Sequence, residues 1–443
     1  MSPAHSESGL RQTRPGSARP NNPVRSNNAE SAYRASPADN PHARFGAASV
    51  LHASDVDSLS SALADNPPES RDLGLYVHVP FCAKRCGYCS FNTAPLEDGA
   101  MARYLEALER EIDMLGAIAW SPRVRLATVF LGGGTPSLLA ADEMAAVLEW
   151  VRARFALAAD AEVTVECNPE SASRDKLAAY RAAGVTRISL GVQSLDDAVL
   201  PKLGRLHDAR GARAAFEAAR AAGFDNVSVD LMYGLPDLDV AVWTASVEGV
   251  LAWEPEHLSA YGLTLDAGSL WAATGVEGLP PEGTVVEQYW ALARAAAARG
   301  FEHYEISNYA QPGFRSRHNQ IYWRAAEYLA AGPGACGFVG DIRYGNVKPV
   351  ARYCAALEAS TLPIETSERL TARQQDSERL FLGLRLIDGV PRAALEARMD
   401  DDASLARRIA AWREAGLLVD RGPNVALTEA GFLVSDALFV ELL

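Results

Sequence analysis

The sequence predicts an α/β protein whose core is a parallel β-sheet that curves toward a barrel. Short β-rich runs alternate with alanine-rich amphipathic stretches over nearly 200 residues, and this alternation is typical of the βαβ units that build parallel sheets. The runs also end in polar or glycine-rich residues. Because the reactive groups of such barrels come from the C-terminal ends of the strands, these residues are expected to line one shared mouth. The predicted strands are 73–79, 127–132, 161–167, 186–192, 226–233 and 257–264, and the predicted helices are 101–118, 141–156, 173–183, 209–223 and 240–252.

Length and composition define the broad class of the protein. The chain has 443 residues, which is enough for two or three domains, and its formal net charge of −14 disfavours binding to nucleic acid. No apolar stretch approaches the roughly 20 residues of a membrane-spanning helix. Three of the six cysteines lie in one loop, so a disulfide framework is not indicated. We therefore expect a cytoplasmic protein without a nucleic-acid partner.

Residues 1–70 differ in composition from the rest of the chain. They are rich in Ser, Ala, Asn, Pro and Arg, have few large apolar residues and show no sustained periodicity. This composition predicts a disordered N-terminal extension. The arginines weakly resemble those of an organelle transit peptide, but the repeated prolines and the acidic residues argue against an amphipathic helix.

The first predicted strand ends in a loop that contains Cys82, Cys86 and Cys89. Three residues separate the first pair and two separate the second, and this spacing can bind three irons of a [4Fe-4S] cluster. The fourth iron then has no cysteine and is open to an outside ligand, whereas electron-transfer ferredoxins close every position. Zinc is the alternative. Its structural sites take four ligands, commonly as two C-x-x-C pairs, and the chain has no second pair.

The second and third predicted strands end in residues suited to a small ligand. Three glycines, residues 132–134, precede Thr135 and allow a ligand to approach the backbone closely. They lack the Lys-Ser/Thr end of a P-loop, and a structural turn is the alternative. Glu166 ends the third strand, where its carboxylate can accept hydrogen bonds from ribose hydroxyls.

Asp230 is a charged residue within the otherwise apolar fifth strand. A carboxylate in such a strand needs a partner that offsets its desolvation. A ligand is one such partner, and a buried ion pair with Arg187 or Arg205 is the structural alternative. Cys167, at the end of the third strand, is interpreted as a small buried hydrophobic residue.

These motifs together resemble the radical S-adenosylmethionine (SAM) superfamily, from about residue 73 to the C-terminus. Within it, the chain resembles the oxygen-independent coproporphyrinogen III oxidase group. The segments that carry this resemblance are Tyr76-Val-His-Val-Pro-Phe, Ile188-Ser-Leu-Gly-Val-Gln-Ser, Leu203-Gly-Arg-Leu-His and Val229-Asp-Leu-Met-Tyr-Gly-Leu-Pro. The resemblance implies a partial (β/α)6 radical SAM barrel that binds SAM through the open iron of the cluster. It implies SAM contacts from Tyr76, Tyr88, Gly133, Gly134, Thr135, Glu166, Gln193, Arg205 and Asp230.

The group contains two functional classes that share this core. One oxidatively decarboxylates coproporphyrinogen III to protoporphyrinogen IX in porphyrin biosynthesis, and the other, the HemW-like heme chaperones, binds heme and delivers it to an acceptor. The oxidases resemble one another in a further cysteine two residues after the third, where this chain has Phe91. Residues 1–70 also lack the apolar pattern of the oxidases' N-terminal arm. Both differences favour a heme chaperone over an enzyme.

Two alternatives to the chaperone stay open at this point, so whether the chain is an enzyme is undecided. One is the oxygen-independent oxidase, and the other is a cluster-bearing scaffold with neither activity. For a chaperone, the resemblance suggests a membrane respiratory enzyme as the heme acceptor, although no residue of the chain identifies one.

Two residues of the C-terminal half are candidate heme ligands. His318 lies in a His-Asn-x-x-Tyr-Trp segment that closely matches a signature of the chaperone branch, and Tyr322 and Trp323 offer flat apolar faces to a porphyrin. A hydrogen-bonded histidine in a domain interface is the alternative. Cys336 stands where the family has histidine in Gly-x-Gly-Ala-His; its thiolate can bind heme iron, and a small buried cysteine is the alternative.

The chain is predicted to divide into three parts. They are a disordered extension (1–70), a radical SAM core barrel (71–310) and a HemW-type C-terminal domain (311–443). Residues 368–443 predict three helices and a β-hairpin, similar to a winged helix. With this net charge, such a domain is expected to dock a partner or cover the barrel mouth rather than to bind DNA.

Overall fold

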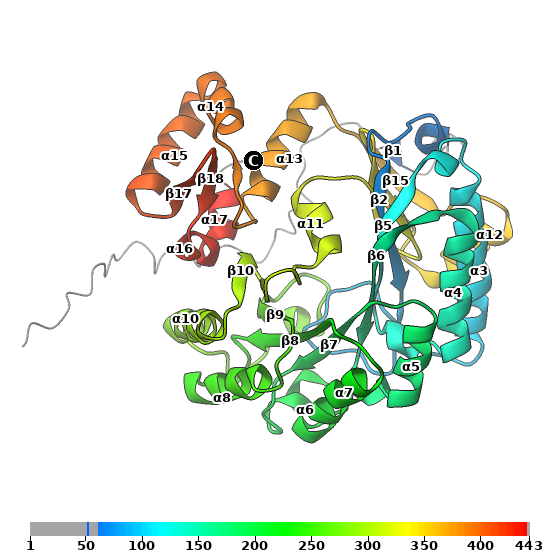
Figure 1. Ribbon diagram of the computed structural model, residues 1–443, viewed down its shortest axis with the longest axis horizontal. Coiled ribbons are helices and arrows are strands. Elements are labelled where there is room, and N and C mark those ends of the chain that lie inside the picture. The colour runs from blue at the N-terminus through cyan, green and yellow to red at the C-terminus, as the bar shows by residue number, and fades with distance from the viewer. Residues whose placement is uncertain (1–50, 53–60, 441–443) are drawn as a thin grey trace, which may run out of the picture.

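The computed structural model describes residues 51–52 and 61–440 and contains one 13-stranded sheet, with the strand order β1-β15-β14-β13-β12-β2-β5-β6-β7-β8-β9-β11-β10 (Figure 1). Six neighbouring strands pair in parallel, which confirms the predicted parallel sheet. They are β2 (Asp72–Val79), β5 (Arg125–Gly133), β6 (Ala156–Cys167), β7 (Arg187–Gln193), β8 (Val227–Tyr233) and β9 (His257–Gly262). Each one overlaps a strand predicted from the sequence.

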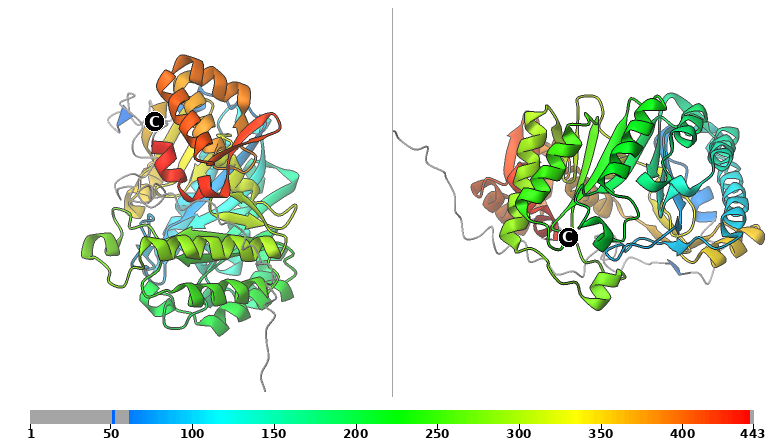
Figure 2. Two further views of the ribbon diagram at one scale, coloured as in Figure 1. Left: turned by 90° about the vertical axis from the view of Figure 1, so that its left-hand side faces the viewer. Right: turned by 90° about the horizontal axis from the view of Figure 1, so that it is seen from below.

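Helices cover the outer face of the parallel strands (Figures 1 and 2). Three of them begin at a polar capping residue: the side chains of Ser173, Asp208 and Asp239 accept hydrogen bonds from backbone N–H groups in the first turns of α5, α7 and α8. The helices that the sequence predicted are present as α3 (Ala100–Gly116), α4 (Ala141–Arg154), α5 (Arg174–Ala182), α7 (Ala209–Ala221) and α8 (Val240–Leu251). The short α6 (Leu200–Leu203) and the longer α10 (Glu282–Ala298) add to this layer.

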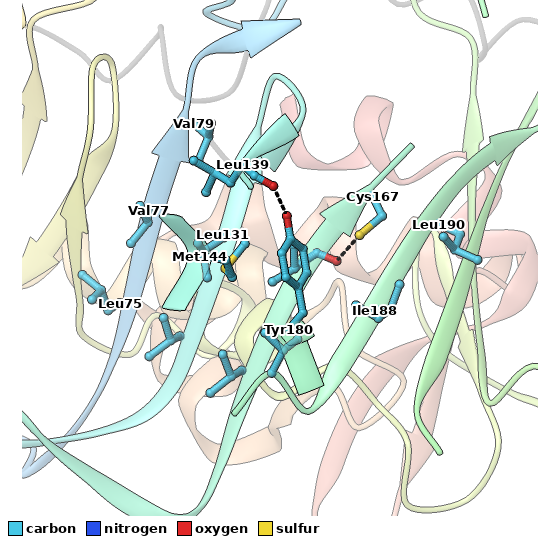
Figure 3. Packing of buried hydrophobic residues seen from close by; sticks show 14 of the residues in the cluster. Leu75, Val77, Val79, Leu131, Leu139, Met144, Cys167, Tyr180, Ile188 and Leu190 are labelled. Carbon is cyan, nitrogen blue, oxygen red and sulfur yellow. Dashed lines mark hydrogen bonds between the residues drawn. The ribbon is translucent and has the colours of Figure 1, made fainter. Parts of the chain in front are cut away.

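The main hydrophobic core lies between the sheet and these helices. Leu75, Val77 and Val79 of β2 are fully buried there (Figure 3). Tyr180 of α5 packs among such residues, and its hydroxyl donates a hydrogen bond to the Leu139 carbonyl over 2.6 Å. Cys167 is 2% exposed in the same core, which confirms its interpretation as a small buried residue. Because side chains alternate along a strand, the residues between these positions face the opposite, concave side of the sheet.

The chain extends the sheet beyond the parallel strands on both sides. One edge is the hairpin β10 (Glu302–Glu305) and β11 (Asn308–Ala310), which follows β9. On the other side β12 (Tyr328–Ala331) pairs in parallel with β2. Three strands then follow in antiparallel pairing: β13 (Cys336–Val339), β14 (Ile342–Asn346) and β15 (Ile364–Arg369). The helix α12 (Val350–Glu358) connects β14 to β15. Residues 328–369, which we had grouped with the C-terminal domain, therefore contribute strands to the large sheet.

The last part of the chain forms its own small core, which lies above α8 and α10 in Figure 1 and in the left view of Figure 2. Its buried residues run from Leu380 to Phe439. The predicted three helices and hairpin are present as α13 (Ala372–Gly383), α14 (Arg392–Asp401), α15 (Ala403–Glu414), β17 (Leu418–Arg421) and β18 (Asn424–Leu427). The short strand β16 (Val390–Pro391) completes a three-stranded sheet, and α16 (Glu429–Leu433) and α17 (Ser435–Val440) end the described chain.

The predicted N-terminal extension needs a correction at its C-terminal end. Residues 61–70 pack on the body of the protein, because Leu63 is fully buried and its carbonyl accepts a hydrogen bond from the Trp120 indole over 3.2 Å. The Asn66 side chain donates to the Val339 carbonyl over 2.6 Å, and β1 (Leu51–His52) pairs with β15. The remainder of the extension, residues 1–50 and 53–60, lies outside the described residues. Among the helices that the structure describes, none has the length and apolar character needed to cross a membrane.

Candidate cofactor site

The three cysteines lie at the mouth of the barrel, directly after β2. Cys82 ends the short strand β3 (Phe81–Cys82), and the loop continues to β4 (Ala94–Pro95). The thiols of Cys82, Cys86 and Cys89 are free and half-buried, and the Cys89 N–H donates to the Cys86 carbonyl over 3.2 Å. Burial raises the pKa of the Cys82 and Cys89 thiols, and the neighbouring cysteines add to this effect. Metal binding requires thiolates and would therefore release protons here.

The donor set of this loop is compatible with a cluster. Three free cysteines lie within it, and each cysteine of an iron–sulfur site binds its own iron. The [4Fe-4S] site stays a prediction, as does its alternative, zinc.

The glycine run at the end of β5 packs directly on the cysteine loop. The Gly134 N–H donates to the Val79 carbonyl over 2.8 Å, and a Cβ atom at this position would lie 2.6 Å from the Phe81 carbonyl oxygen. The Thr135 hydroxyl donates to the Cys82 sulfur over 3.6 Å. Gly133 has a φ of +114°, and a Cβ there would lie 2.6 Å from the His78 ring. Only glycine permits this close packing, so the run shapes the cysteine loop.

A cavity of about 190 Å³ lies on the concave side of the sheet, and the short helix α11 (Arg317–Trp323) forms part of its wall. The predicted residues Tyr76, Glu166, Asp230 and His318 line it. Tyr76 and Glu166 meet at Gly132, where a Cβ would lie 3.1 Å from an atom of each. The structure therefore brings together side chains from β2, β6, β8 and α11.

Neither acid of the cavity forms a salt bridge with another described residue, although the charge of Arg187, in the same cavity wall, lowers the pKa of Asp230 against the larger effect of burial. Glu166 accepts a hydrogen bond from the Gly133 N–H over 3.0 Å, and burial, together with the nearby Asp230, raises its pKa to about 8. Asp230 accepts hydrogen bonds from the Ser189 hydroxyl at 3.0 and 3.1 Å, and burial raises its pKa. Both carboxyls are therefore placed to receive a polar or cationic ligand.

The alternative of a structural ion pair at Asp230 is not realised among the described residues. Arg187 donates to the Asn226 side chain over 2.9 Å and to the Phe314 carbonyl over 3.1 Å. Arg205 donates to the Asn168 side chain over 2.7 Å and to the Gly191 carbonyl. Neither arginine forms a salt bridge with Asp230.

Gln193 and Arg205 meet at the end of β7, as predicted for two ligand contacts. A Cβ on Gly191 would lie 3.2 Å from the side-chain nitrogen of each. Gln193 has a φ of +68°, which is uncommon for a residue other than glycine. Its Oε1 and the Nε of Arg205 are buried without a hydrogen-bond partner. Backbone strain and unpaired polar atoms gather at ligand sites, so this corner fits a bound polar ligand.

The titration of Glu166 leads to a testable stability prediction. The native state retains this proton up to about pH 8, whereas an unfolded chain releases it near the ordinary glutamate pKa of 4.5. The native state therefore binds more protons between these values, and its stability falls as the pH rises through them. In the ligand-free wild type, we expect the free energy of unfolding to fall by an amount on the order of 3 kcal/mol between pH 5 and pH 9. The Glu166→Gln variant should not show this fall. Chemical denaturation at several pH values checks this, and equal pH profiles for the two proteins would contradict it.

His318 is hydrogen-bonded through both ring nitrogens. Nδ1 lies 2.7 Å from the Thr128 hydroxyl, and Nε2 lies 2.8 Å from the Tyr322 hydroxyl. The ring stacks on Phe130 with a centroid distance of 5.1 Å, and burial lowers its pKa to about 3. The imidazole is thus neutral and enclosed, as the hydrogen-bonded alternative expects, and its role as a heme ligand stays a prediction.

Cys336 and Trp323 have different surroundings from those of His318. Cys336 begins β13 and is exposed, so the alternative of a small buried cysteine is wrong for this residue. It follows a tight turn on the sheet extension, where its β-partner Gly345 has no side chain to cover it. The Trp323 ring lies under the Arg385 guanidinium at 4.5 Å, within the contact between α11 and the C-terminal core.

Several residues of the cavity were not singled out from the sequence. His257 bonds to the Ser228 hydroxyl over 2.7 Å and to the Tyr304 hydroxyl over 2.9 Å, and Tyr261 lines the same wall. Both stand at alternate positions of a predicted strand. Polar residues stand at every second position of that strand and therefore face the inside of the barrel. This pattern was the signal that could have identified them.

Comparisons with known proteins agree with this arrangement. The model of the Radical SAM superfamily matches residues 76–243, and the model of the HemN C-terminal domain matches residues 370–434. The heme chaperone HemW of Mycobacterium tuberculosis (strain H37Rv) is 39% identical over 383 residues, which cover 85% of this chain and 96% of that protein. The chain belongs to the HemW branch of the radical SAM superfamily.

A second HemW relative and one solved structure extend the likeness over most of the chain. The heme chaperone HemW of Bacillus subtilis is 34% identical and covers 82% of this chain and 97% of its own length. The coproporphyrinogen III oxidase HemN of Escherichia coli, described as a radical SAM enzyme, superposes with a TM-score of 0.76 over 87% of this chain and 93% of its own. At 23% identity, this second likeness shows that the HemW branch and HemN share a fold.

Proposed function

We propose that this protein is a heme chaperone that carries a [4Fe-4S] cluster with SAM on its open iron and delivers heme to an acceptor protein. The observation that carries the proposal is the loop of three free thiols at the barrel mouth, with Phe91 rather than a further cysteine after Cys89. Two relatives that align over nearly their full length are named heme chaperone HemW, which supports the same function. The oxidase remains the second candidate, supported by the fold shared with HemN.

Different residues of the barrel mouth would bind the cluster and the amino-acid end of SAM. Cys82, Cys86 and Cys89 would ligate three irons, and the backbone at Gly133 and Gly134 with the Thr135 hydroxyl would line the amino-acid end of SAM. A reduced cluster bound here would supply one electron to the sulfonium of SAM.

Four further side chains are proposed to hold the rest of SAM. Glu166 would accept hydrogen bonds from the ribose hydroxyls, and its proton would leave as the cationic ligand enters. The unpaired atoms of Gln193 and Arg205 and the carboxyl of Asp230 would provide further polar contacts. Tyr76 and Tyr88 would lie beside the nucleoside and the cluster and exclude water.

The two proposed heme ligands differ in how easily heme can reach them. The cavity beside His318 has a volume of about 190 Å³, below the ≈300–1,000 Å³ of common ligand pockets, and a porphyrin needs a large one. His318 would also have to give up a hydrogen bond to Thr128 or Tyr322 before it could bind iron. Cys336 is exposed and its sulfur has only a long contact, 4.0 Å, to the Gly334 carbonyl. We therefore propose Cys336 as the first contact with heme iron.

An anaerobic heme titration, followed by Soret absorption, tests the proposed function. We expect saturation near one heme per chain in the wild type. Cys336→Ala is expected to weaken binding by about tenfold, which corresponds to about 1.4 kcal/mol. His318→Ala is expected to weaken binding less and to lower the thermal stability instead, because it leaves the Thr128 and Tyr322 hydroxyls without their partner.

The competing function is checked in the same preparation. Cluster-loaded protein given SAM, a reductant and coproporphyrinogen III should produce no decarboxylated porphyrinogen. The absence of saturable heme binding, or the appearance of that product, would favour the oxidase over the chaperone.

A further inference from the structure

Residues 263–280, which we call the covering segment, pack on the outer side of the cysteine loop. The segment follows β9 and contains the short helix α9 (Leu270–Thr274). Three hydrogen bonds join it to three different parts of the loop, so it fixes the loop along its length rather than at one point. They run from the Trp271 N–H to the Gly87 carbonyl (2.9 Å), from Arg85 Nη2 to the Gly268 carbonyl (3.1 Å) and from the Ser90 hydroxyl to the Asp266 carboxylate (3.1 Å).

The indole of Trp271 lies directly over Gly87, which sits between two of the predicted iron ligands. A Cβ atom built on Gly87 would lie 2.3 Å from the indole Nε1 and 2.7 Å from Cδ1, closer than non-bonded atoms can approach. The Tyr88 ring lies beside the same indole, with a centroid distance of 6.0 Å. Tryptophan at this position therefore requires glycine in the loop, and the two residues are fitted to each other.

The cysteine loop depends on this contact because it has few hydrogen bonds of its own. Within the loop, the Cys89 N–H donates to the Cys86 carbonyl over 3.2 Å, and the Arg85 side chain donates to the Cys89 carbonyl over 3.3 Å. A loop with so little internal bonding takes its shape from what packs on it. On the inner side this includes Gly134, and on the outer side it includes Trp271. Near the end of the loop, the Asn92 side chain donates to the Pro333 and Lys348 carbonyls, each over 2.9 Å.

The covering segment is itself held at both ends by the end of β8. Near its start, the Leu263 N–H donates to the Tyr233 carbonyl over 2.9 Å. Near its end, the Gly278 carbonyl accepts a hydrogen bond from the Asp237 N–H over 2.8 Å, and the Asp237 carboxylate forms an ion pair with Lys202 at 2.7 Å. The segment that carries the indole is thus bonded to the body of the protein at both of its ends.

From these contacts we infer that Trp271 is a positioning residue for the iron–sulfur cluster. Its indole fixes the backbone at Gly87 and with it the directions of the Cys86 and Cys89 thiolates, and it covers this side of the loop against water and oxygen. The inference rests on the proposed cluster. Groups that orient metal ligands and limit solvent access set the stability and electronic properties of a metal site, and their loss typically costs 10–100-fold in affinity or activity.

The test compares Trp271→Ala, Gly87→Ala and the double variant after anaerobic reconstitution. The measured quantities are iron per chain, the rate at which the cluster absorption bleaches in air, and the EPR spectrum of the reduced cluster with and without SAM. Trp271→Ala is expected to take up the cluster but to bleach about tenfold faster and to change the EPR spectrum. Gly87→Ala is expected to do the same, because its methyl group displaces the indole.

The double variant and a neighbouring residue provide the matched controls. Once the indole is removed, the Gly87→Ala methyl group has room, so the double variant should bleach no faster than Trp271→Ala alone. Leu270→Ala changes the adjacent residue of the same helix, which is 58% exposed, and should bleach at the wild-type rate. Thermal melts of each cluster-free variant separate an effect on the cluster from an effect on folding.

The outcomes distinguish the inference from the function on which it rests. If the wild type takes up a cluster but Trp271→Ala matches its bleaching rate and its EPR spectrum, Trp271 is not a positioning residue. If the two substitutions accelerated bleaching additively in the double variant, Trp271 would likewise not be a positioning residue. If the wild type takes up no iron and sulfide at all, the proposed function itself fails and the inference fails with it.

Discussion

Replacing Cys86 with serine is expected to abolish the iron–sulfur cluster of the reconstituted protein. Three thiols lie in the described loop at the barrel mouth, and Cys86 is the middle one. A serine hydroxyl is not deprotonated at neutral pH and cannot replace a thiolate. With two protein ligands left for a cluster that already has one open iron, we expect iron and sulfide to fall from about four of each per chain to near zero.

Iron and sulfide analysis and the cluster absorption band check this expectation. Cys354→Ser is the matched control, because Cys354 is buried in α12, outside the cysteine loop, with its sulfur 3.9 Å from the Arg103 carbonyl. The control should retain the full cluster. A Cys86→Ser protein that kept its iron would show that a group outside the loop completes the site, and the assignment of the three thiols would need revision.

The parallel core was predictable because its signals are local. Each strand and each covering helix has its own periodicity in the sequence, and side-chain alternation alone assigns Glu166 and Asp230 to the concave face. The cysteine loop was equally accessible, since its three ligands lie within eight residues. Where a feature depends on neighbours along the chain, the sequence alone was sufficient to predict it.

Features that depend on long-range contacts were not predictable in the same way. Leu63 is the one large apolar residue of 61–70, and its carbonyl accepts a hydrogen bond from Trp120, which lies far along the chain. The enclosure of His318 likewise depends on Thr128 of β5, which supplies one of its hydrogen bonds. No local pattern encodes such pairs, so a heme-ligand motif and a hydrogen-bonded histidine look alike until the fold brings the partners together.

Trp271 illustrates the same limit at the proposed cluster site. Its helix is five residues long and separated from the cysteine loop by more than 180 positions. Along the sequence, the glycine at position 87 indicates a sharp turn of the backbone between Cys86 and Cys89. Its second role, leaving space for an indole, becomes visible only when the two segments lie in contact.

A second large effect is expected from Glu111, a buried acid of α3 that organises the turn before Cys336. Its carboxylate accepts hydrogen bonds from the Gly332 N–H (2.7 Å), from the Asn346 side chain (2.6 Å) and from the Tyr353 hydroxyl (2.6 Å). Glu111 is 1% exposed, and burial raises its pKa to about 7. One side chain thereby joins the helical layer to the turn between β12 and β13, to β14 and to α12.

Replacing Glu111 with alanine removes the shared acceptor and leaves the Gly332 N–H and the Tyr353 hydroxyl without a partner. It also removes one of the two hydrogen bonds of Asn346 Nδ2, which still donates to the Gly332 carbonyl over 3.0 Å. Each such donor costs about 1–3 kcal/mol, so we expect a loss of roughly 3 kcal/mol or more in the free energy of unfolding. The loss should appear as a melting temperature lower by roughly 5–10 °C. Because the turn carries Cys336, heme affinity should fall together with stability if Cys336 contacts the iron.

Glu111→Gln is the matched variant for this effect, because it preserves the volume of the side chain and one acceptor oxygen. Its amide nitrogen can donate but not accept, so it should restore part of the stability and leave at least one donor unpaired. Thermal unfolding and heme titration of the two variants give both readouts. A Glu111→Ala protein that melts at the wild-type temperature would mean that water replaces the carboxylate without cost. A destabilised variant with unchanged heme affinity would instead separate this turn from the heme site and direct the search for the iron ligand back to His318.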